Sequence, residues 1–247
     1  MKVYDRILEK ALSRGRGRLV EDVRIGLGYT AVKLSDGKLG LAYTVLEEKT
    51  TCNLLAPEVS FAGRPADLVA RSFLSSNLLE AGVGLATINA ILNQPRDDYL
   101  YGDPLELLSL EPEDRVAMVG YFEPLARRLR GRVAELWIFE RTEGRLAEAL
   151  SEAEMFTYLP EATIVILTAV TLINKTFEEV ISLVERPREM LLLGPSTPLV
   201  PEVFEGYPIS LLSGVLVKNE GILQPVSEAK GMRAFGPFIE KLSLKLK

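Results

Sequence analysis

Five short apolar runs in the second half of the chain alternate with segments of helical spacing, and this alternation constrains the fold more than any other feature. The apolar runs cover residues 115–122, 133–140, 162–168, 190–194 and 214–218. The helices predicted between most of them cover residues 124–130, 176–184 and 198–204. Continuous apolar strands that alternate with helices are typical of a parallel sheet buried on both faces. We therefore predict a Rossmann-like α/β domain over residues 109–247.

The first half of the chain has a different pattern, which predicts an α+β domain over residues 1–108. Helical spacing covers residues 4–14, 66–73 and 78–92. Short β-like runs around the turn Ser35-Asp36-Gly37-Lys38 predict an antiparallel meander over residues 20–43. Gly82 and Gly84 are unfavourable inside a helix. We expect them to mark close packing against the meander or a break between two helices.

Composition and charge exclude several classes of protein. Hydrophobic residues make up 47% of the chain and charged residues 26%, a typical globular balance that argues against disorder. The net charge of −5 argues against a nucleic-acid partner, which needs a basic surface. We expect the basic run 127–132 to lie at a helix C-terminus, where cations complement the dipole, rather than to bind phosphate. The longest apolar stretch, 162–173, is too short to span a bilayer, so we expect no membrane partner.

The chain contains no histidine and a single cysteine, Cys52. A Ser-His-Asp triad, a Cys-His pair and an imidazole-bound zinc are therefore excluded, and one thiolate cannot build a structural zinc site. Any proton chemistry must fall to Asp, Glu, Lys, Tyr or Cys52, and we expect Cys52 to be inert because no base accompanies it. The single cysteine and the charged N-terminal segment lead us to expect a cytoplasmic protein.

Ligands of open parallel sheets bind beyond the carboxyl ends of the strands, so the candidate site residues are those that follow the apolar runs. Gly120 follows the first run, without the other glycines of a dinucleotide-binding fingerprint. It either belongs to a ligand-binding turn or simply ends a strand. Glu140 ends the second run, at the spacing of about 20 residues where an acidic side chain meets a ribose in nucleotide-binding sheets. A solvated loop glutamate is the alternative.

Two further loops are rich in hydroxyl and amide groups. The third run is followed by Thr168, Thr171, Asn174 and Thr176, which are more polar groups than the capping of one helix requires. We expect at least Thr171 or Asn174 to contact a ligand. The fourth run is followed by Gly194, Pro195, Ser196, Thr197 and Pro198. We expect Ser196 or Thr197 to cap a helix that begins at Pro198. The free N–H groups of that helix would bind an anion, or the helix would be capped with nothing bound.

The Thr168–Thr176 turn and the Leu192–Leu199 loop together resemble the putative heavy-metal chelation domain family, and the segment 77–93 fits that family's N-terminal helix. The resemblance covers nearly the whole chain. It implies an enolase-N-terminal-like domain followed by a Rossmann-like domain, with a site in the cleft between them. The residues implied at that site are Thr168, Thr171, Asn174, Gly194, Ser196 and Thr197, with Asn77 and Glu80 opposite. The resemblance also implies a role in handling metals or metal chelates.

Three functions are compatible with these features. The first is a chelation-related protein, expected as a homodimer, that binds a small anionic molecule or a metal chelate in the cleft. The second is a transferase-like enzyme that acts on such a molecule with a nucleotide-like cosubstrate at Glu140. The third is a structural or regulatory dimer without a ligand. Soft metal ions prefer thiolate and imidazole, so a chelate fits this composition better than a bare heavy metal. A hard metal ion bound by carboxylates is the alternative. For the first function, we expect Asn174→Ala or Ser196→Ala to leave folding nearly intact and abolish binding.

Overall fold

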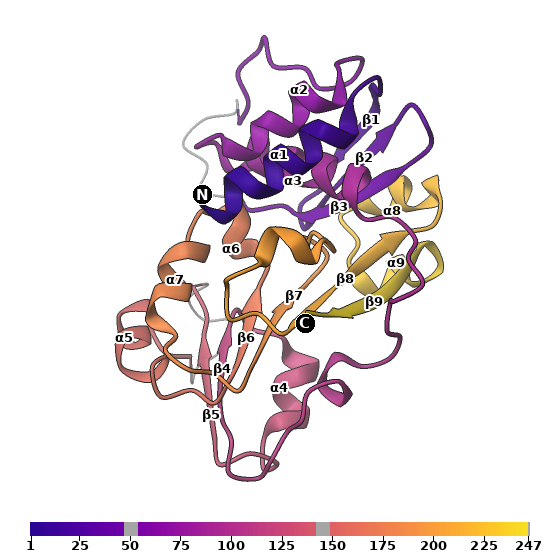
Figure 1. Cartoon of the computed structure of the whole chain (residues 1–247). Coiled ribbons are helices and arrows are strands. Elements are labelled where there is room, and N and C mark those ends of the chain that lie inside the picture. The colour runs from indigo at the N-terminus through magenta and orange to yellow at the C-terminus, as the bar shows by residue number, and fades with distance from the viewer. Residues whose placement is uncertain (47–53, 142–148, 247) are drawn as a thin grey trace.

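The computed structural model describes residues 1–46, 54–141 and 149–246. It contains two sheets, an antiparallel one of order β1-β2-β3 and a six-stranded one of order β5-β4-β6-β7-β8-β9. The first sheet lies with helices α1, α2 and α3 at one end of the molecule, and the second forms the rest (Figure 1). The predicted fold class, an α+β unit followed by a Rossmann-like sheet, is confirmed.

The N-terminal unit follows the predicted element order closely. Its elements are α1 (Val3–Gly15), β1 (Val20–Ile25), β2 (Tyr29–Leu34), β3 (Leu39–Tyr43), α2 (Ala66–Ala70), the 3₁₀ turn η1 (Arg71–Leu74) and α3 (Leu78–Leu92). Helix α3 continues through both of its glycines. A Cβ atom on Gly84 would lie 2.0 Å from the backbone nitrogen of Phe73, so this glycine permits close packing against η1. A Cβ atom on Gly82 would lie 3.4 Å from the carbonyl oxygen of Tyr43, so Gly82 packs against strand β3 of the meander, as predicted. The alternative of a broken helix is wrong.

The C-terminal unit is built around the six-stranded sheet. Its strands are β4 (Arg115–Val119), β5 (Glu135–Phe139), β6 (Ile164–Thr168), β7 (Glu189–Leu193), β8 (Leu211–Val217) and β9 (Ile239–Lys245). Its helices are α4 (Glu123–Leu129), α5 (Met155–Tyr158), α6 (Val170–Ile173), α7 (Phe177–Leu183), α8 (Leu223–Ser227) and α9 (Met232–Phe235). Its 3₁₀ turns are η3 (Glu152–Glu154), η4 (Pro201–Phe204), η5 (Glu220–Ile222) and η6 (Gly236–Phe238), and η2 (Pro104–Glu106) precedes β4. The first five strands pair in parallel, whereas β9 pairs antiparallel with β8.

Two features of this unit differ from the sequence predictions. The helix predicted over 198–204 is only the turn η4, because Pro201 lacks an N–H and holds Val200 in an extended conformation (φ −130°, ψ 94°). Strand β9 was not predicted, since polar residues interrupt its apolar positions at the sheet edge. The basic run does lie at the end of α4, as expected, and its Arg127 pairs with Glu123 at 2.5 Å.

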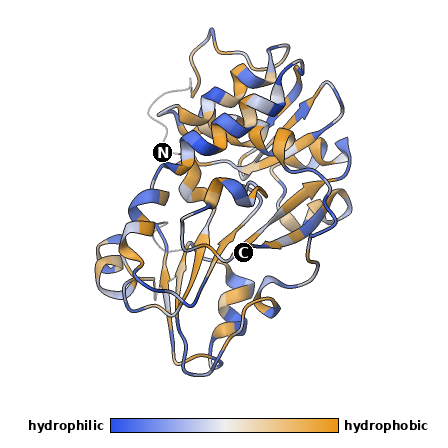
Figure 2. Ribbon diagram, viewed as in Figure 1, coloured by the Kyte–Doolittle hydropathy of each residue, from blue (hydrophilic) through white to orange (hydrophobic). Residues whose placement is uncertain are grey.

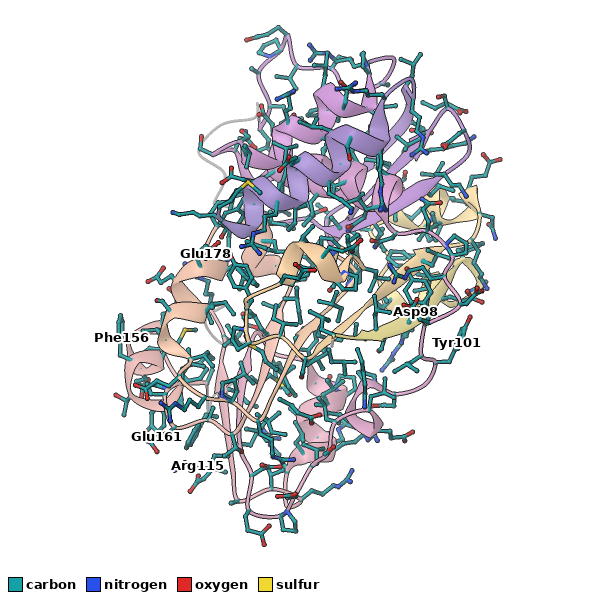
Figure 3. All side chains as sticks on the ribbon, in the orientation of Figure 1. Asp98, Tyr101, Arg115, Phe156, Glu161 and Glu178 are labelled. Atoms are coloured by element: carbon teal, nitrogen blue, oxygen red, sulfur yellow. The ribbon has the colours of Figure 1, made fainter. Side chains whose placement is uncertain are left out.

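The hydrophobic core runs through both units. The strands of the larger sheet are predominantly hydrophobic (Figure 2). Buried side chains on one face of this sheet belong to the same cluster as those of α1 and α3, whereas those on the other face form a second cluster with Ala126 and Leu129 of α4. A third cluster joins Leu41 of β3 to Val215 of β8 and Phe235 of α9. Polar contacts reinforce this packing. Glu178 of α7, labelled in Figure 3, accepts hydrogen bonds from the backbone N–H of Val3 (2.8 Å) and from the hydroxyl of Tyr207 (2.7 Å). Within the described ranges, no helix has the length and apolar character needed to cross a membrane.

Candidate functional site

The strand order of the larger sheet reverses between β4 and β6, and the chain segments after these two strands approach closely. Strand β5 lies on one side of β4, and β6, β7 and β8 follow on the other side. Gly120 follows β4 with a φ of 89°, in a region that favours glycine. A Cβ atom there would lie 2.9 Å from the Cβ of Thr168, the last residue of β6. This is the switch point at which open α/β sheets bind ligands.

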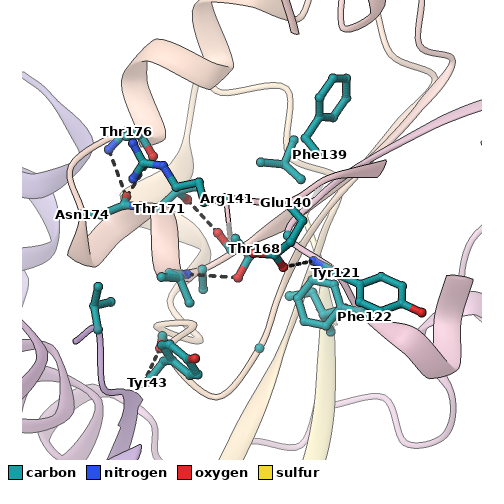
Figure 4. A pocket seen from close by; sticks show the side chains of 18 of the residues that line it. Tyr43, Tyr121, Phe122, Phe139, Glu140, Arg141, Thr168, Thr171, Asn174 and Thr176 are labelled. Atoms are coloured by element: carbon teal, nitrogen blue, oxygen red, sulfur yellow. Dashed lines mark hydrogen bonds between the residues drawn. The ribbon is translucent and has the colours of Figure 1, made fainter. Parts of the chain in front are cut away.

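A pocket of about 400 Å³ opens at this switch point, within the size range of small-molecule sites. Its sheet side is formed by residues that follow four of the parallel strands (Figure 4). Its opposite side is formed by the N-terminal sheet and the segment after it, through Leu27, Tyr29, Tyr43, Thr44, Val45 and Leu46. The pocket therefore lies between the two units.

The structure brings most of the predicted site residues together in this pocket. Those among its lining residues are Gly120, Glu140, Thr168, Thr171, Asn174, Gly194 and Ser196. Glu140 follows β5 beside the turn after β4, and its Oε2 accepts a hydrogen bond from the backbone N–H of Tyr121 at 3.1 Å. The carboxylate is thus fixed next to Gly120, although the two residues are far apart in sequence.

The turn after β6 uses some of its polar groups to hold its own shape. The Thr171 hydroxyl donates to the Thr168 carbonyl at 2.7 Å, and Oδ1 of Asn174 accepts from the hydroxyl of Thr176 at 2.8 Å and from its N–H at 3.3 Å. Thr168, Asn174 and Thr176 all border the pocket. The turn therefore presents donors and acceptors that internal hydrogen bonds keep in place.

The loop after β7 joins the two units rather than starting a helix. The hydroxyl oxygen of Ser196 accepts a hydrogen bond from the backbone N–H of Tyr43 at 2.8 Å. Asn93, which follows α3, donates to the Thr197 carbonyl at 3.0 Å and accepts from the Leu199 N–H at 2.7 Å. Asn89 donates to the Pro195 carbonyl at 3.4 Å. The anion site expected at a helix beginning with Pro198 does not form, because no helix begins there.

Three predicted residues lie elsewhere. Thr197 is fully buried and is not among the described lining residues. Asn77 caps α3 by accepting hydrogen bonds from the N–H groups of Leu79 and Glu80, and Glu80 accepts from the Ser75 hydroxyl at 2.7 Å. Neither Asn77 nor Glu80 is among the described lining residues. Both hold the start of the helix whose far end carries Asn89 and Asn93.

Lys175 is a partly buried cation behind the pocket wall. It has a φ of 65°, and its Nζ donates to the carbonyl of Phe73 and, at 3.1 Å, to that of Leu172. The same atom lies 3.9 Å from the centre of the Phe73 ring. Burial lowers the pKa of Lys175 to about 8. The amino group thus binds the N-terminal unit, and Lys175 is not one of the described lining residues.

The charged groups at the pocket are few. Glu140, Arg141 and Glu152 line it, and Arg141 forms an ion pair with Glu152. Across residues 1–46, 54–141 and 149–246, no cluster of three or more His, Cys, Asp or Glu side chains is arranged to hold a metal ion. Cys52 lies outside these ranges.

Sequence reasoning missed the residues that the N-terminal unit contributes. Tyr29 and Tyr43 lie on strands β2 and β3, and their rings contact each other edge to face with centroids 5.7 Å apart. Leu27 and Leu46 are exposed at the pocket edge. Nothing in the local pattern of the meander distinguishes these positions, since their role depends on packing against a distant part of the chain.

Proteins that resemble this chain over nearly its whole length have the same fold. An uncharacterised protein of Methanocaldococcus jannaschii is 27% identical over 232 residues, which cover 87% of this chain and 86% of that protein. A crystal structure of a DUF364-family protein of unknown function from Pyrococcus horikoshii has a TM-score of 0.87 at 24% identity and covers 99% of this chain and 100% of its own. Another, from Desulfitobacterium hafniense, has a TM-score of 0.84 at 25% identity, with coverages of 98% and 97%.

Two family models, both described as putative heavy-metal chelation, match the chain. The DUF4213 model matches residues 8–92, and the DUF364 model matches residues 103–245. The second match alone covers more than half of the chain, which confirms the resemblance drawn from the two loops. The chain belongs to the DUF364 family, whose description is putative heavy-metal chelation.

Proposed function

We propose that the pocket between the two units binds a small anionic molecule or a metal chelate. The observation that carries this proposal is the position of the pocket at the switch point, where the ends of β4, β5, β6 and β7 converge on one cavity. Thr168, Thr171 and Asn174 would bind the polar groups of the ligand. Gly194 and Ser196 would form the wall next to the N-terminal unit.

The donor groups of the pocket do not fit a resident heavy-metal ion. Soft and borderline metals prefer thiolate and imidazole ligands, and the chain has one cysteine and no histidine. The pocket instead offers hydroxyl, amide and carboxylate groups. We therefore propose that a heavy metal would enter as cargo, already enclosed by an organic chelator whose oxygen and nitrogen atoms the protein recognises.

Thr197, Asn77 and Glu80 would act indirectly in this proposal. Thr197 belongs to the loop that Asn93 holds, and Asn77 and Glu80 stabilise the start of α3. The division of the chain at residue 108, a homodimeric state, a cytoplasmic location and the absence of a nucleic-acid partner stay predictions.

A catalytic role and a ligand-free structural role are the two alternatives to binding, and the described residues of the site favour neither. Catalysis without histidine needs a carboxylate or lysine with a shifted pKa in the cleft, and the amino group of Lys175 bonds to Phe73 and Leu172 instead. A purely structural protein would fill the cleft with side chains, whereas this cleft holds a cavity of about 400 Å³.

Titration calorimetry with citrate, ferric citrate and nickel citrate would test the proposal. We expect at least one of these probes to bind the parent protein and to lose most of its affinity for Asn174→Ala. Ser182→Ala is a matched control, because its hydroxyl bonds only to a carbonyl of its own helix on the exposed side of α7. Equal affinities of the parent and Asn174→Ala would contradict the assignment of the pocket.

A further inference from the structure

We infer that the Glu140 end of the pocket recognises the vicinal hydroxyl groups of a ribose, so that the bound molecule carries a ribonucleotide moiety. This inference rests on the proposed function, because it names a ligand class for the same pocket. It assigns to Glu140 a role that the neighbouring hydroxyl-rich turn cannot fill. A carboxylate has two acceptor oxygens and no donor, and so can accept a hydrogen bond from each of two adjacent hydroxyl groups.

The position of Glu140 carries the first step of the argument. It follows β5, whose neighbour β4 leads into Gly120 at the switch point. In nucleotide-binding sheets, the acidic residue that holds the ribose occupies the corresponding place, after the strand next to the one that leads into the glycine turn. The structure reproduces this arrangement although the chain lacks the remaining glycines of the fingerprint.

The orientation of the carboxylate carries the second step. The backbone N–H of Tyr121 donates to Oε2 at 3.1 Å, so the carboxylate is held toward the turn after β4, and it borders the cavity (Figure 4). Glu140 is partly exposed rather than buried. A role limited to bracing the Tyr121 turn would account for this hydrogen bond, and the test below separates that role from ribose recognition.

The rest of the pocket suits the remainder of a nucleotide. Aromatic and apolar side chains, among them Phe122, Tyr43 and Met155, offer surfaces for a base. Hydroxyl and amide groups of Thr168, Thr171 and Asn174 lie across the switch point from Glu140 and would bind the polar part beyond the ribose. A cavity of about 400 Å³ is within the range that holds small-molecule ligands.

Calorimetry with AMP, GMP, CMP and UMP, each compared with its 2′-deoxy counterpart, tests the inference. We expect at least one ribonucleotide to bind about 10- to 100-fold more tightly than its deoxy form, the range of a hydrogen bond to a charged group. Glu140→Gln keeps an oxygen acceptor for the Tyr121 N–H, so the fold should survive. It should reduce ribonucleotide affinity to about the level of the deoxy form. Glu135→Gln, which removes an exposed carboxylate at the start of β5 that is not among the described lining residues, should keep the preference for ribose.

Two results would overturn the inference. One is binding of all four ribonucleotides no tighter than their deoxy forms, including no binding at millimolar concentration. The other is a preference for ribose that persists in Glu140→Gln, which would leave Glu140 with a bracing role alone. If the citrate complexes bind while ribonucleotides do not, the proposed function stands and only the ligand class is wrong. If both sets of probes fail, the proposed function fails as well.

Discussion

The backbone N–H of Tyr43 donates a 2.8 Å hydrogen bond to the hydroxyl oxygen of Ser196. The bond joins the end of β3 to the loop after β7, beside the pocket that both residues line. One side chain therefore contributes to the pocket wall and to the junction of the two units. Binding and stability are consequently linked at this position.

Ser196→Ala should destabilise the protein as well as weaken binding. The variant leaves the Tyr43 N–H without its acceptor at a partly buried junction, which costs about 1–3 kcal/mol. Urea unfolding of the parent and the variant would measure this cost. Ser13→Ala is the control, because the Ser13 hydroxyl bonds to a carbonyl of its own exposed helix turn. The expectation from sequence that Ser196→Ala leaves folding nearly intact is thus revised, and unchanged unfolding would restore it.

Asn93→Ala should destabilise the junction further. It removes both the donor to the Thr197 carbonyl and the acceptor of the Leu199 N–H in a buried setting, at a cost of about 2–4 kcal/mol. Gln94→Ala, whose amide bonds mainly within α3, should cost less. Denaturant midpoints would show the difference, and similar midpoints for the two variants would argue against a junction held by Asn93.

Lys175 should make stability depend on alkaline pH. Its pKa in the folded state is about 8, below its unfolded value of about 10.4. Between these values the unfolded chain binds more protons at Lys175, so the free energy of unfolding should rise as the pH rises from 8 to 9. At higher pH, Tyr4, Tyr99 and Tyr207, whose pKa values burial raises to about 12, act in the opposite direction. Unfolding series at several pH values should show this rise in the parent and in Lys241→Met, an exposed lysine variant on β9. The rise should be absent in Lys175→Met; a slope that persists there would contradict the assignment.

Asp114 should contribute to acid sensitivity at the other end of the sheet. Burial raises the pKa of Asp114, but hydrogen bonds from Arg188, the N–H of Glu111 and the Thr163 hydroxyl outweigh it, and the net pKa is lowered. The lowered pKa stabilises the folded protein above the unfolded pKa of about 3.9. This stabilisation is lost as the pH falls through the pKa of Asp114 in the folded state.

Asp114→Asn should therefore lower stability at pH 7 by about 1–3 kcal/mol and flatten the loss of stability below pH 4. Acid unfolding followed by circular dichroism would measure both effects. Glu161→Gln removes an exposed ion pair with Arg115 at the same end of the molecule (Figure 3). This variant should change the stability at pH 7 and the acid transition only slightly. An unaltered acid transition in Asp114→Asn would count against this role.

Local sequence patterns predicted the features that depend on nearby residues. Alternating apolar runs gave the parallel strands, and residues after those runs, such as Gly120 and Thr168, do meet at the switch point. The prediction of a helix from Pro198 was wrong, because Pro201 holds Val200 in an extended conformation despite the capping residues that precede it. Asn93 and Tyr43 escaped notice because their partners are more than a hundred residues away. Such pairings arise from the packing of two units, and no local sequence pattern indicates them.

Native mass spectrometry of freshly purified protein, compared with its denatured mass and metal content, tests the central claim most directly. We predict a bound small molecule, with or without a metal ion, that is lost on denaturation and absent from Asn174→Ala purified in parallel. A molecule retained equally by the parent and by Asn174→Ala would contradict the claim that the pocket at the switch point binds it.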